Sequence, residues 1–151
     1  MTETLPAAPG SYALVMRNHV RKHVDVGRLG RILFERGYLV YVGSAFGPGG
    51  LRARVGRHAS TNKTLHWHVD YLRPHVELEE AWLTTDAGNR EHDWAQRLGA
   101  RLEIAHPRFG SSDCRCVSHL FFADDRPAPD LIGEDVCIAS FFREPNVYLP
   151  R

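Results

Sequence analysis

Short apolar runs, rich in β-branched and aromatic residues, predict the strands of this chain at about residues 11–17, 38–43 and 76–84. The first two are joined by a loop of a size that most easily makes them antiparallel neighbours. Within that loop, the glycines of 27–30 predict a loop or hairpin, and Ile32–Phe34 predicts a further short strand.

The pattern changes to helical spacing after the Gly-rich turn at 47–50. Leu51 and Val55 share one face of a helix predicted over 50–59, and Arg54 and His58 share an adjacent face. Both pairs are four residues apart. The helix therefore presents an apolar side to a core and places one arginine beside one histidine.

Two more helices are predicted further along the chain. Apolar residues recur at i, i+4 and i+7 over 65–72, and Pro74 ends that segment. Asn89 is a plausible N-cap for a helix over 90–103. Glu91 lies one turn before the apolar face of that helix, so we expect its carboxylate to point toward the side of the core.

The two ends of the chain carry weaker patterns. Residues 1–9, with two prolines, are expected to form a short disordered arm. Apolar segments at 117–123 and 136–142 predict two late strands, separated by a connector rich in proline and aspartate.

Composition indicates one soluble globular domain. The chain has 151 residues, 43% hydrophobic and 25% charged. No run approaches the roughly 18 apolar residues of a membrane span, and the start lacks the pattern of a signal peptide. Three cysteines, two of them one residue apart, do not suggest a disulfide framework. We therefore expect a cytoplasmic protein that does not associate with membranes.

Charge is distributed unevenly along the chain. Residues 1–68 hold ten Lys/Arg against three Asp/Glu, a net +7, whereas 69–151 hold nine against fifteen, a net −6. A basic half beside an acidic half suggests a surface for a polyanion. The alternative is that salt bridges within the fold pair these charges, and that their uneven distribution along the sequence has no functional meaning.

A small set of polar residues has the chemistry needed to cut a phosphodiester. That reaction needs a positioned water, a base and positive charge for the pentavalent phosphate. Arg54 supplies a fixed cation, and Tyr12 or His58 could take the proton. Glu91 could hold a hard cation such as Mg²⁺, with waters completing its coordination.

These residues resemble the GIY-YIG endonuclease superfamily. Its first motif is matched by Gly10-Ser11-Tyr12 and its second by Tyr41-Val42-Gly43. Arg54 and His58 match its helix pattern, and Glu91 matches its metal-binding glutamate. The motifs at 41–50, 66–71 and 109–119 resemble one poorly characterised branch, whose members occur alone or fused to endonuclease III-type repair glycosylases. This association suggests DNA repair by analogy.

The resemblance implies an α+β fold with a central antiparallel sheet of about three strands flanked by helices. It also implies a nuclease-like domain at 10–123 and an extension at 124–151, with a C-terminal strand or tail, packed on the same domain. DNA is the implied substrate, and Mg²⁺ or Mn²⁺ the implied cofactor. Tyr12 is implied as base or water-orienting group, Tyr41 as a positioning residue, Arg54 as transition-state stabiliser and His58 as a proton-transfer aid. The chain departs from the pattern at Ser11 and in the insert at 47–50.

Further residues are candidates for contact with nucleic acid, although each has a plainer reading. Arg52 and Arg57 are solvated helix charges or non-specific phosphate contacts. His66 either faces DNA or forms structural hydrogen bonds, and with Asp70 it has the i, i+4 spacing of a metal pair. The full set of expected nucleic-acid contacts is Gly43, Arg52, Arg57, Lys63 and His66.

A second candidate site comprises Cys114, Cys116 and His119. These residue types bind zinc, but the usual spacing leaves at least two residues between cysteines, and a fourth ligand is not evident. His106 or Cys137 could complete the set. We do not expect zinc from this pattern, and a structural or site-lining segment is the preferred interpretation over a catalytic cysteine.

The sequence therefore predicts a metal-dependent DNA endonuclease. Two other classes remain open. One is a nucleic-acid-binding module that keeps the fold without catalysis. The other is a metal- or thiol-dependent enzyme centred on the Cys/His segment.

Overall fold

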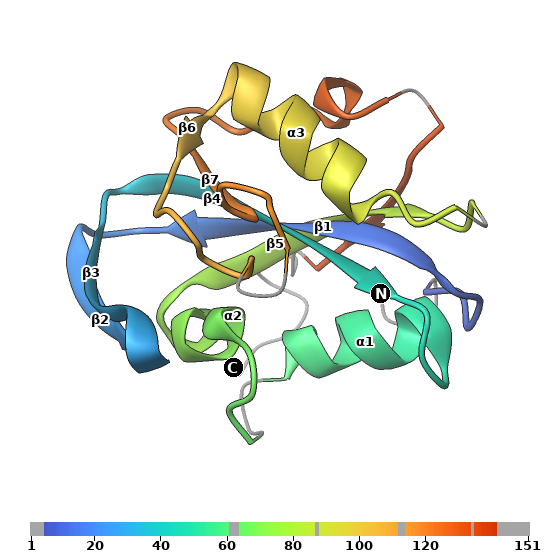
Figure 1. Ribbon diagram of the computed structural model, residues 1–151, viewed down its shortest axis with the longest axis horizontal. Helices are drawn as coiled ribbons and strands as arrows, with labels where there is room; N and C mark the ends of the chain where they lie inside the picture. Colours follow the sequence, from blue (N-terminus) through green and yellow to red (C-terminus); the bar gives the residue numbers. More distant parts are fainter. Residues whose placement is uncertain (1–4, 61–63, 87, 112–113, 134, 142–151) are drawn as a thin grey trace, which may run out of the picture.

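The computed structural model describes residues 5–60, 64–86, 88–111, 114–133 and 135–141. Its centre is a six-stranded antiparallel sheet in the order β6-β7-β4-β1-β5-β8 (Figure 1). The predicted α+β class is confirmed, but the sheet is twice the predicted size. The strands are β1 Gly10–Asn18, β4 Gly37–Ala45, β5 Glu77–Thr84, β6 Glu103–Ile104, β7 Leu120–Ala123 and β8 Cys137–Ser140.

The strands predicted at about 11–17, 38–43 and 76–84 are the middle of this sheet. β1 pairs with β4 on one side and with β5 on the other. The expectation of about three strands was wrong because both outer edges of this core are extended. β7 pairs with β4, placing Leu120 opposite Tyr41, and β8 pairs with β5, placing Ala139 opposite Ala81. The two late strands predicted at 117–123 and 136–142 are therefore present, as β7 and β8.

A separate hairpin fills the segment between β1 and β4. β2 Lys22–Val26 pairs with β3 Gly30–Phe34 through a short 3-10 turn, η2 Gly27–Leu29. Gly27 and Gly30 both have positive φ, at 46° and 83°, which suits glycine at a tight reversal. The hairpin allowed by the sequence is therefore present.

Helices cover both faces of the sheet, giving three layers (Figure 1). α1 Gly50–Ala59 and α2 His68–Leu72 lie on one face, and α3 Glu91–Arg101 lies on the other. Side chains of β1 alternate between the layers, as strand geometry requires. Tyr12, Leu14 and Met16 pack in the cluster with Leu51 and Val55 of α1, whereas Ala13 and Val15 pack with Trp94 and Leu98 of α3.

Two 3-10 turns complete the described elements, η3 Arg73–His75 and η4 Pro129–Leu131. No helix in the described part of the chain is long and apolar enough to cross a membrane.

The helix predicted over 65–72 is shorter than expected and begins at His68. Leu65, assigned to its apolar face, is 47% exposed. The reason is the buried carboxylate of Asp70, whose Oδ2 accepts hydrogen bonds from the backbone N–H groups of His66 and Trp67. These bonds hold the preceding residues outside the helix, because side-chain bonds to the backbone compete with helical ones.

The N-terminal segment is ordered from Leu5, contrary to the expected arm over 1–9; residues 1–4 lie outside the description. Leu5 is fully buried in the core. The carbonyls of Ala8 and Pro6 accept the backbone N–H groups of Leu51 and Arg52, at 2.9 and 2.8 Å. They satisfy two of the unpaired donors at the start of α1.

Candidate active site

A polar cavity of about 260 Å³ lies where the edge of β4 is left open. β7 pairs with β4 only as far as Tyr41, and the backbone N–H of Val42 then bonds to the carbonyl of His119. Beyond this point the described residues place no strand against that edge. Side chains from both faces of the sheet meet there, and the walls include Tyr12, Tyr41, Gly43, Arg54, Glu91, Cys114 and His119.

Tyr12 lines the site, and His58 lies directly behind Tyr12. The Tyr12 hydroxyl lies 2.7 Å from His58 Nε2, and His58 is fully buried behind it. The Tyr41 ring packs edge-on against His58, with centroids 6.0 Å apart. Burial raises the pKa of both tyrosines well above the usual value. Both are therefore neutral phenols at physiological pH.

Gly43 is required by the position of Tyr12. The two residues are opposite one another in the β1–β4 register. A Cβ on Gly43 would lie 2.3 Å from the Tyr12 hydroxyl oxygen and 2.4 Å from the ring carbon that bears it. The glycine of the second motif thus makes room for the tyrosine of the first.

Arg54 projects from α1 into the cavity as a fixed cation. Its Nη1 donates to the Ser44 carbonyl at 2.9 Å, and its guanidinium carbon lies 4.5 Å from the centre of the Trp67 ring. Within the described residues, no carboxylate forms an ion pair with it. The charge of Arg54 is therefore held in place yet not neutralised, which suits an anionic ligand.

Glu91 enters the cavity from the first turn of α3. Its Oε1 accepts from the Ser44 hydroxyl at 2.8 Å, and its Oε2 lies 2.9 Å from His119 Nδ1. Burial acts to raise the Glu91 pKa, but the bonds from His119 and Ser44 outweigh it and the pKa is lowered. The carboxylate is thus ionised at neutral pH. Its remaining lone pairs could hold a hard divalent cation.

Cys114 and His119 of the second candidate site line this same cavity, whereas Cys116 lines a separate pocket that shares His92 with it. Cys114 and His119 are among the cavity walls, and His92 Nδ1 lies 3.1 Å from Cys116 Sγ. Burial and the neighbouring Cys114 raise the Cys116 pKa to about 11, which argues against a nucleophilic thiolate there. Cys114, Cys116 and His119 form a possible metal-binding group with His92. Neither His106 nor Cys137 belongs to that group.

The expected nucleic-acid contacts fall into different places. Arg52 donates to the Leu5 carbonyl and anchors the N-terminal segment. Arg57 is not a solvated charge, because its guanidinium makes two bonds to buried Asp70, at 2.9 and 3.0 Å. His66 packs beside Trp67, and Asp70 is occupied by Arg57 and backbone amides rather than by a metal shared with His66. Lys63 lies outside the described residues.

Four residues that line the site were not predicted from the sequence: Ser44, Trp67, His92 and Gly110. Ser44 follows Gly43 directly, and strand alternation puts its hydroxyl on the face that carries α3. Trp67 packs under the guanidinium groups of Arg54 and Arg57, at 4.5 and 4.4 Å. His92 adjoins Glu91, and that adjacency to a predicted site residue was the available signal.

The structure is therefore an α+β domain with a polar cavity that combines two buried tyrosines, an ionised glutamate and an arginine that no carboxylate of the described residues pairs with. A family model described as "Domain of unknown function DUF123" matches residues 11–137. The chain belongs to that family. Neither a curated protein nor a solved structure matches the chain significantly.

Proposed function

We propose that the protein is a metal-dependent endonuclease that hydrolyses DNA phosphodiester bonds, a nuclease of the GIY-YIG type. The observation that supports this most directly is the shared cavity. Tyr12, Tyr41, Arg54 and Glu91 come from two strands and two helices, yet all four line one space of about 260 Å³. Residues that the order of the motifs assigns to one site therefore also lie together in space.

Arg54 is the group that binds the phosphate. A guanidinium presents parallel N–H donors that fit two phosphate oxygens, and its charge offsets the charge that develops in the pentavalent transition state. The Ser44 carbonyl and the Trp67 ring hold it on one side. The fixed position lowers the cost of reorganising the site during the reaction.

Tyr12 and His58 form the proton path. Because burial keeps Tyr12 a phenol at neutral pH, it cannot act as a free phenolate base. Tyr12 instead accepts the proton of the attacking water as its own proton passes to His58 Nε2, 2.7 Å away. The water oxygen forms a bond to phosphorus, the bond from phosphorus to the leaving sugar oxygen breaks, and that oxygen takes a proton from solvent to leave as a hydroxyl.

Glu91 would hold Mg²⁺ or Mn²⁺. The donor fits, because an ionised carboxylate 20% exposed at a polar cavity suits a hard cation that keeps most of its waters. When bound, such an ion supplies Lewis-acid stabilisation of the phosphate charge. Ser44 and His119 orient the carboxylate, and Arg54 complements the ion from α1.

A cleavage assay tests the proposal. Labelled single-stranded, duplex, branched, flapped and damaged DNAs are incubated with Mg²⁺ or Mn²⁺. Tyr12→Phe, Arg54→Ala and Glu91→Gln should each lower the rate by at least about 10²-fold. Arg101→Ala is the matched control, because this exposed arginine sits at the other end of α3, roughly 15 Å from Glu91. It should cut at nearly the wild-type rate.

Two results would contradict the proposal. The first is that no DNA form is cut by wild-type protein that is folded and metal-loaded. The second is cutting that survives in all three site variants, which would point to a contaminating nuclease. Salt-dependent DNA binding without cutting, unchanged in Glu91→Gln, would favour the non-catalytic binding module.

A further inference from the structure

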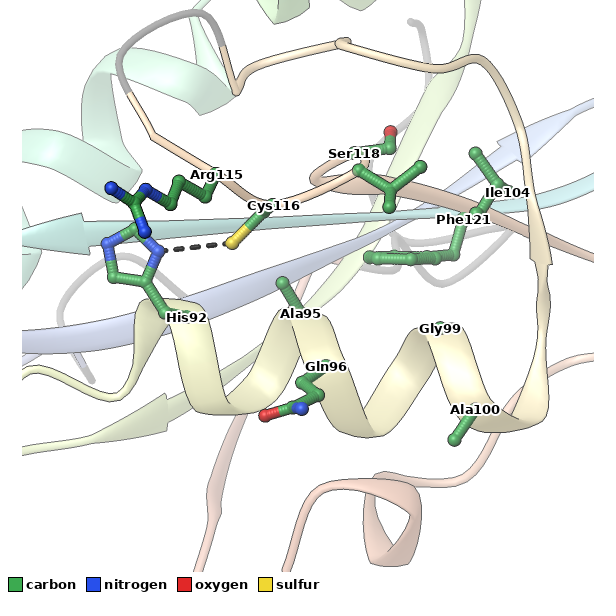
Figure 2. A pocket seen from close by; sticks show the side chains of 11 residues that line it. His92, Ala95, Gln96, Gly99, Ala100, Ile104, Arg115, Cys116, Ser118 and Phe121 are labelled. Atoms are coloured by element: carbon green, nitrogen blue, oxygen red, sulfur yellow. Dashed lines mark hydrogen bonds between the residues drawn. The ribbon is translucent and has the colours of Figure 1, made fainter.

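Four potential metal ligands converge beside the cavity from two separate segments. His92 lies in the first turn of α3, and Cys114, Cys116 and His119 lie on the segment that leads into β7. The ligand atoms of all four lie within 4.8 Å of one another. Figure 2 shows the His92 ring and the Cys116 sulfur pointing toward each other across the gap between helix and loop.

The distances are close to those of a tetrahedral metal site. Cys114 Sγ lies 3.4 Å from His119 Nε2, and Cys116 Sγ lies 3.1 Å from His92 Nδ1. Zinc bonds of about 2.3 Å to sulfur and about 2.0 Å to nitrogen place neighbouring ligand atoms roughly 3.3–3.8 Å apart. No two of the four ligand atoms are more than 4.8 Å apart, so no separation has to shorten by more than about 1.5 Å to reach tetrahedral values.

The His119 ring is already held in the tautomer that a metal requires. Its Nδ1 faces Glu91 Oε2 at 2.9 Å and the Val42 carbonyl at 3.3 Å. Both partners are acceptors, so the ring proton is assigned to Nδ1. Nε2, which faces Cys114, then carries the free lone pair in the neutral ring. A carboxylate that accepts from one nitrogen while the other faces a metal is the usual arrangement around metal-bound histidines.

We propose that His92, Cys114, Cys116 and His119 bind one zinc ion, and that Glu91 orients His119 toward it. Two thiolates and two imidazoles favour a borderline or soft cation over Mg²⁺, which prefers oxygen. Two thiolates also cancel the charge of a divalent ion. His92 is exposed, which leaves a path for the ion from solvent.

A C-x-C spacing is unfavourable for zinc where one loop must supply every ligand. A separate helix supplies the fourth ligand here, so the loop does not have to wrap the ion alone. A bound zinc would tie the segment from 114 to 119 to the start of α3. Through His119 it would also fix the carboxylate of Glu91 at the cavity.

Metal analysis tests this inference independently of any DNA cutting. Protein purified without chelators and dialysed should retain about one zinc per chain. Substitution with cobalt alone should give the intense visible bands of a tetrahedral site and a near-ultraviolet thiolate charge-transfer band. Zinc affinity is then measured by competition with a chromogenic chelator.

The variants separate the ligands from the orienting residue. Cys116→Ser and His92→Asn should each weaken zinc binding by more than 10²-fold, and Glu91→Gln by about 10–100-fold with one zinc still bound. Cys137→Ser is the matched control, since this exposed cysteine on β8 lies outside the cluster, and it should bind zinc as wild type does. Circular dichroism confirms that each variant is folded; if Cys116→Ser unfolds, His92→Asn at the exposed position carries the test.

Three outcomes would overturn the inference. One is a folded, reduced protein that binds no zinc or cobalt more tightly than the chelator does. Another is equal loss of binding in Cys137→Ser and Cys116→Ser. A third is a Cys114–Cys116 disulfide, detected by mass, that forms in place of the metal site. Unchanged affinity in Glu91→Gln would remove the orienting role alone, and loss of DNA cutting with zinc retained would count only against the proposed nuclease.

Discussion

Gly43→Ala offers the sharpest test of how the two motifs fit together. The added Cβ would lie 2.3 Å from the Tyr12 hydroxyl oxygen, whereas ordinary contact begins near 3.4 Å. Tyr12 must therefore recede by about 1 Å, at a cost of roughly 1–3 kcal/mol for overpacking a tight site. For a chain of this size, about 2–4 °C of melting temperature corresponds to each kcal/mol, so the expected drop is about 2–12 °C.

The same movement should disturb the chemistry. The Tyr12 hydroxyl lies 2.7 Å from His58 Nε2, and a displacement of about 1 Å breaks that hydrogen bond. A misplacement of this size typically lowers an enzymatic rate by about 10²-fold. We therefore expect DNA cutting by Gly43→Ala to fall by about that factor, even at temperatures where the variant is fully folded.

Gly56→Ala is the matched control for this substitution. Gly56 lies in α1, between Arg54 and His58, and a Cβ there meets nothing within 4 Å. Alanine favours a helix over glycine, so this variant should gain up to about 1 kcal/mol. Thermal unfolding by circular dichroism compares the two variants. If Gly43→Ala melts at or above the wild-type temperature, the argument about the close approach to Tyr12 is wrong.

The remaining predictions concern buried ionisable groups. Asp70→Asn removes one member of a buried ion pair and should lower the free energy of unfolding by about 3 kcal/mol at pH 7, measured by urea denaturation. Burial acts to raise the Asp70 pKa, but the bonds from Arg57 and from two backbone amides outweigh it and hold the pKa below its usual value. The stability that Asp70 contributes is therefore fully present above about pH 4 and is lost as pH falls through the lower folded-state pKa, an acid loss that Asp70→Asn should lack. In an alkaline absorbance titration, Tyr12 and Tyr41 should ionise well above pH 10, and each Tyr→Phe variant should remove one late step. The free energy of unfolding should fall as pH rises past about 10, because these tyrosines lose their protons in the unfolded chain before they do so in the folded protein. Early ionisation of both tyrosines would refute their burial.

The central strands and the two long helices could be predicted from sequence because burial imposes a clear period on them. In β1, the side chains of Ala13 to Met16 are buried on both faces of the sheet. In α3, the buried residues Trp94, Ala95 and Leu98 share one face of the helix, as expected. The outer strands were harder to delimit. β6 has two exposed residues, and Ile138 of β8 is 51% exposed, so neither shows the pattern of a buried strand.

The candidate site was only partly predictable for a different reason. Tyr12, Tyr41, Arg54 and Glu91 were assigned by motif order, and the structure brings them together. The sequence predicts the Cys/His segment as a second site, because nothing local in the sequence shows where this loop folds back onto the sheet. The backbone bond between Val42 and His119, 77 residues apart, sets that return. Asp70 shortens α2 because its carboxylate accepts hydrogen bonds from the backbone N–H groups of His66 and Trp67. The spacing of apolar residues does not predict such bonds.

The way α1 is held at its start has a practical consequence for work with this protein. The helix that carries Arg54 and His58 is capped by the carbonyls of Ala8 and Pro6, and the buried side chain of Leu5 anchors this cap. Its first amide groups are thus already occupied and unavailable to a phosphate. Recombinant versions that begin after residue 9 would remove the cap and loosen both residues at once. An inactive preparation of such a shortened protein would therefore report on its truncation and not on its chemistry.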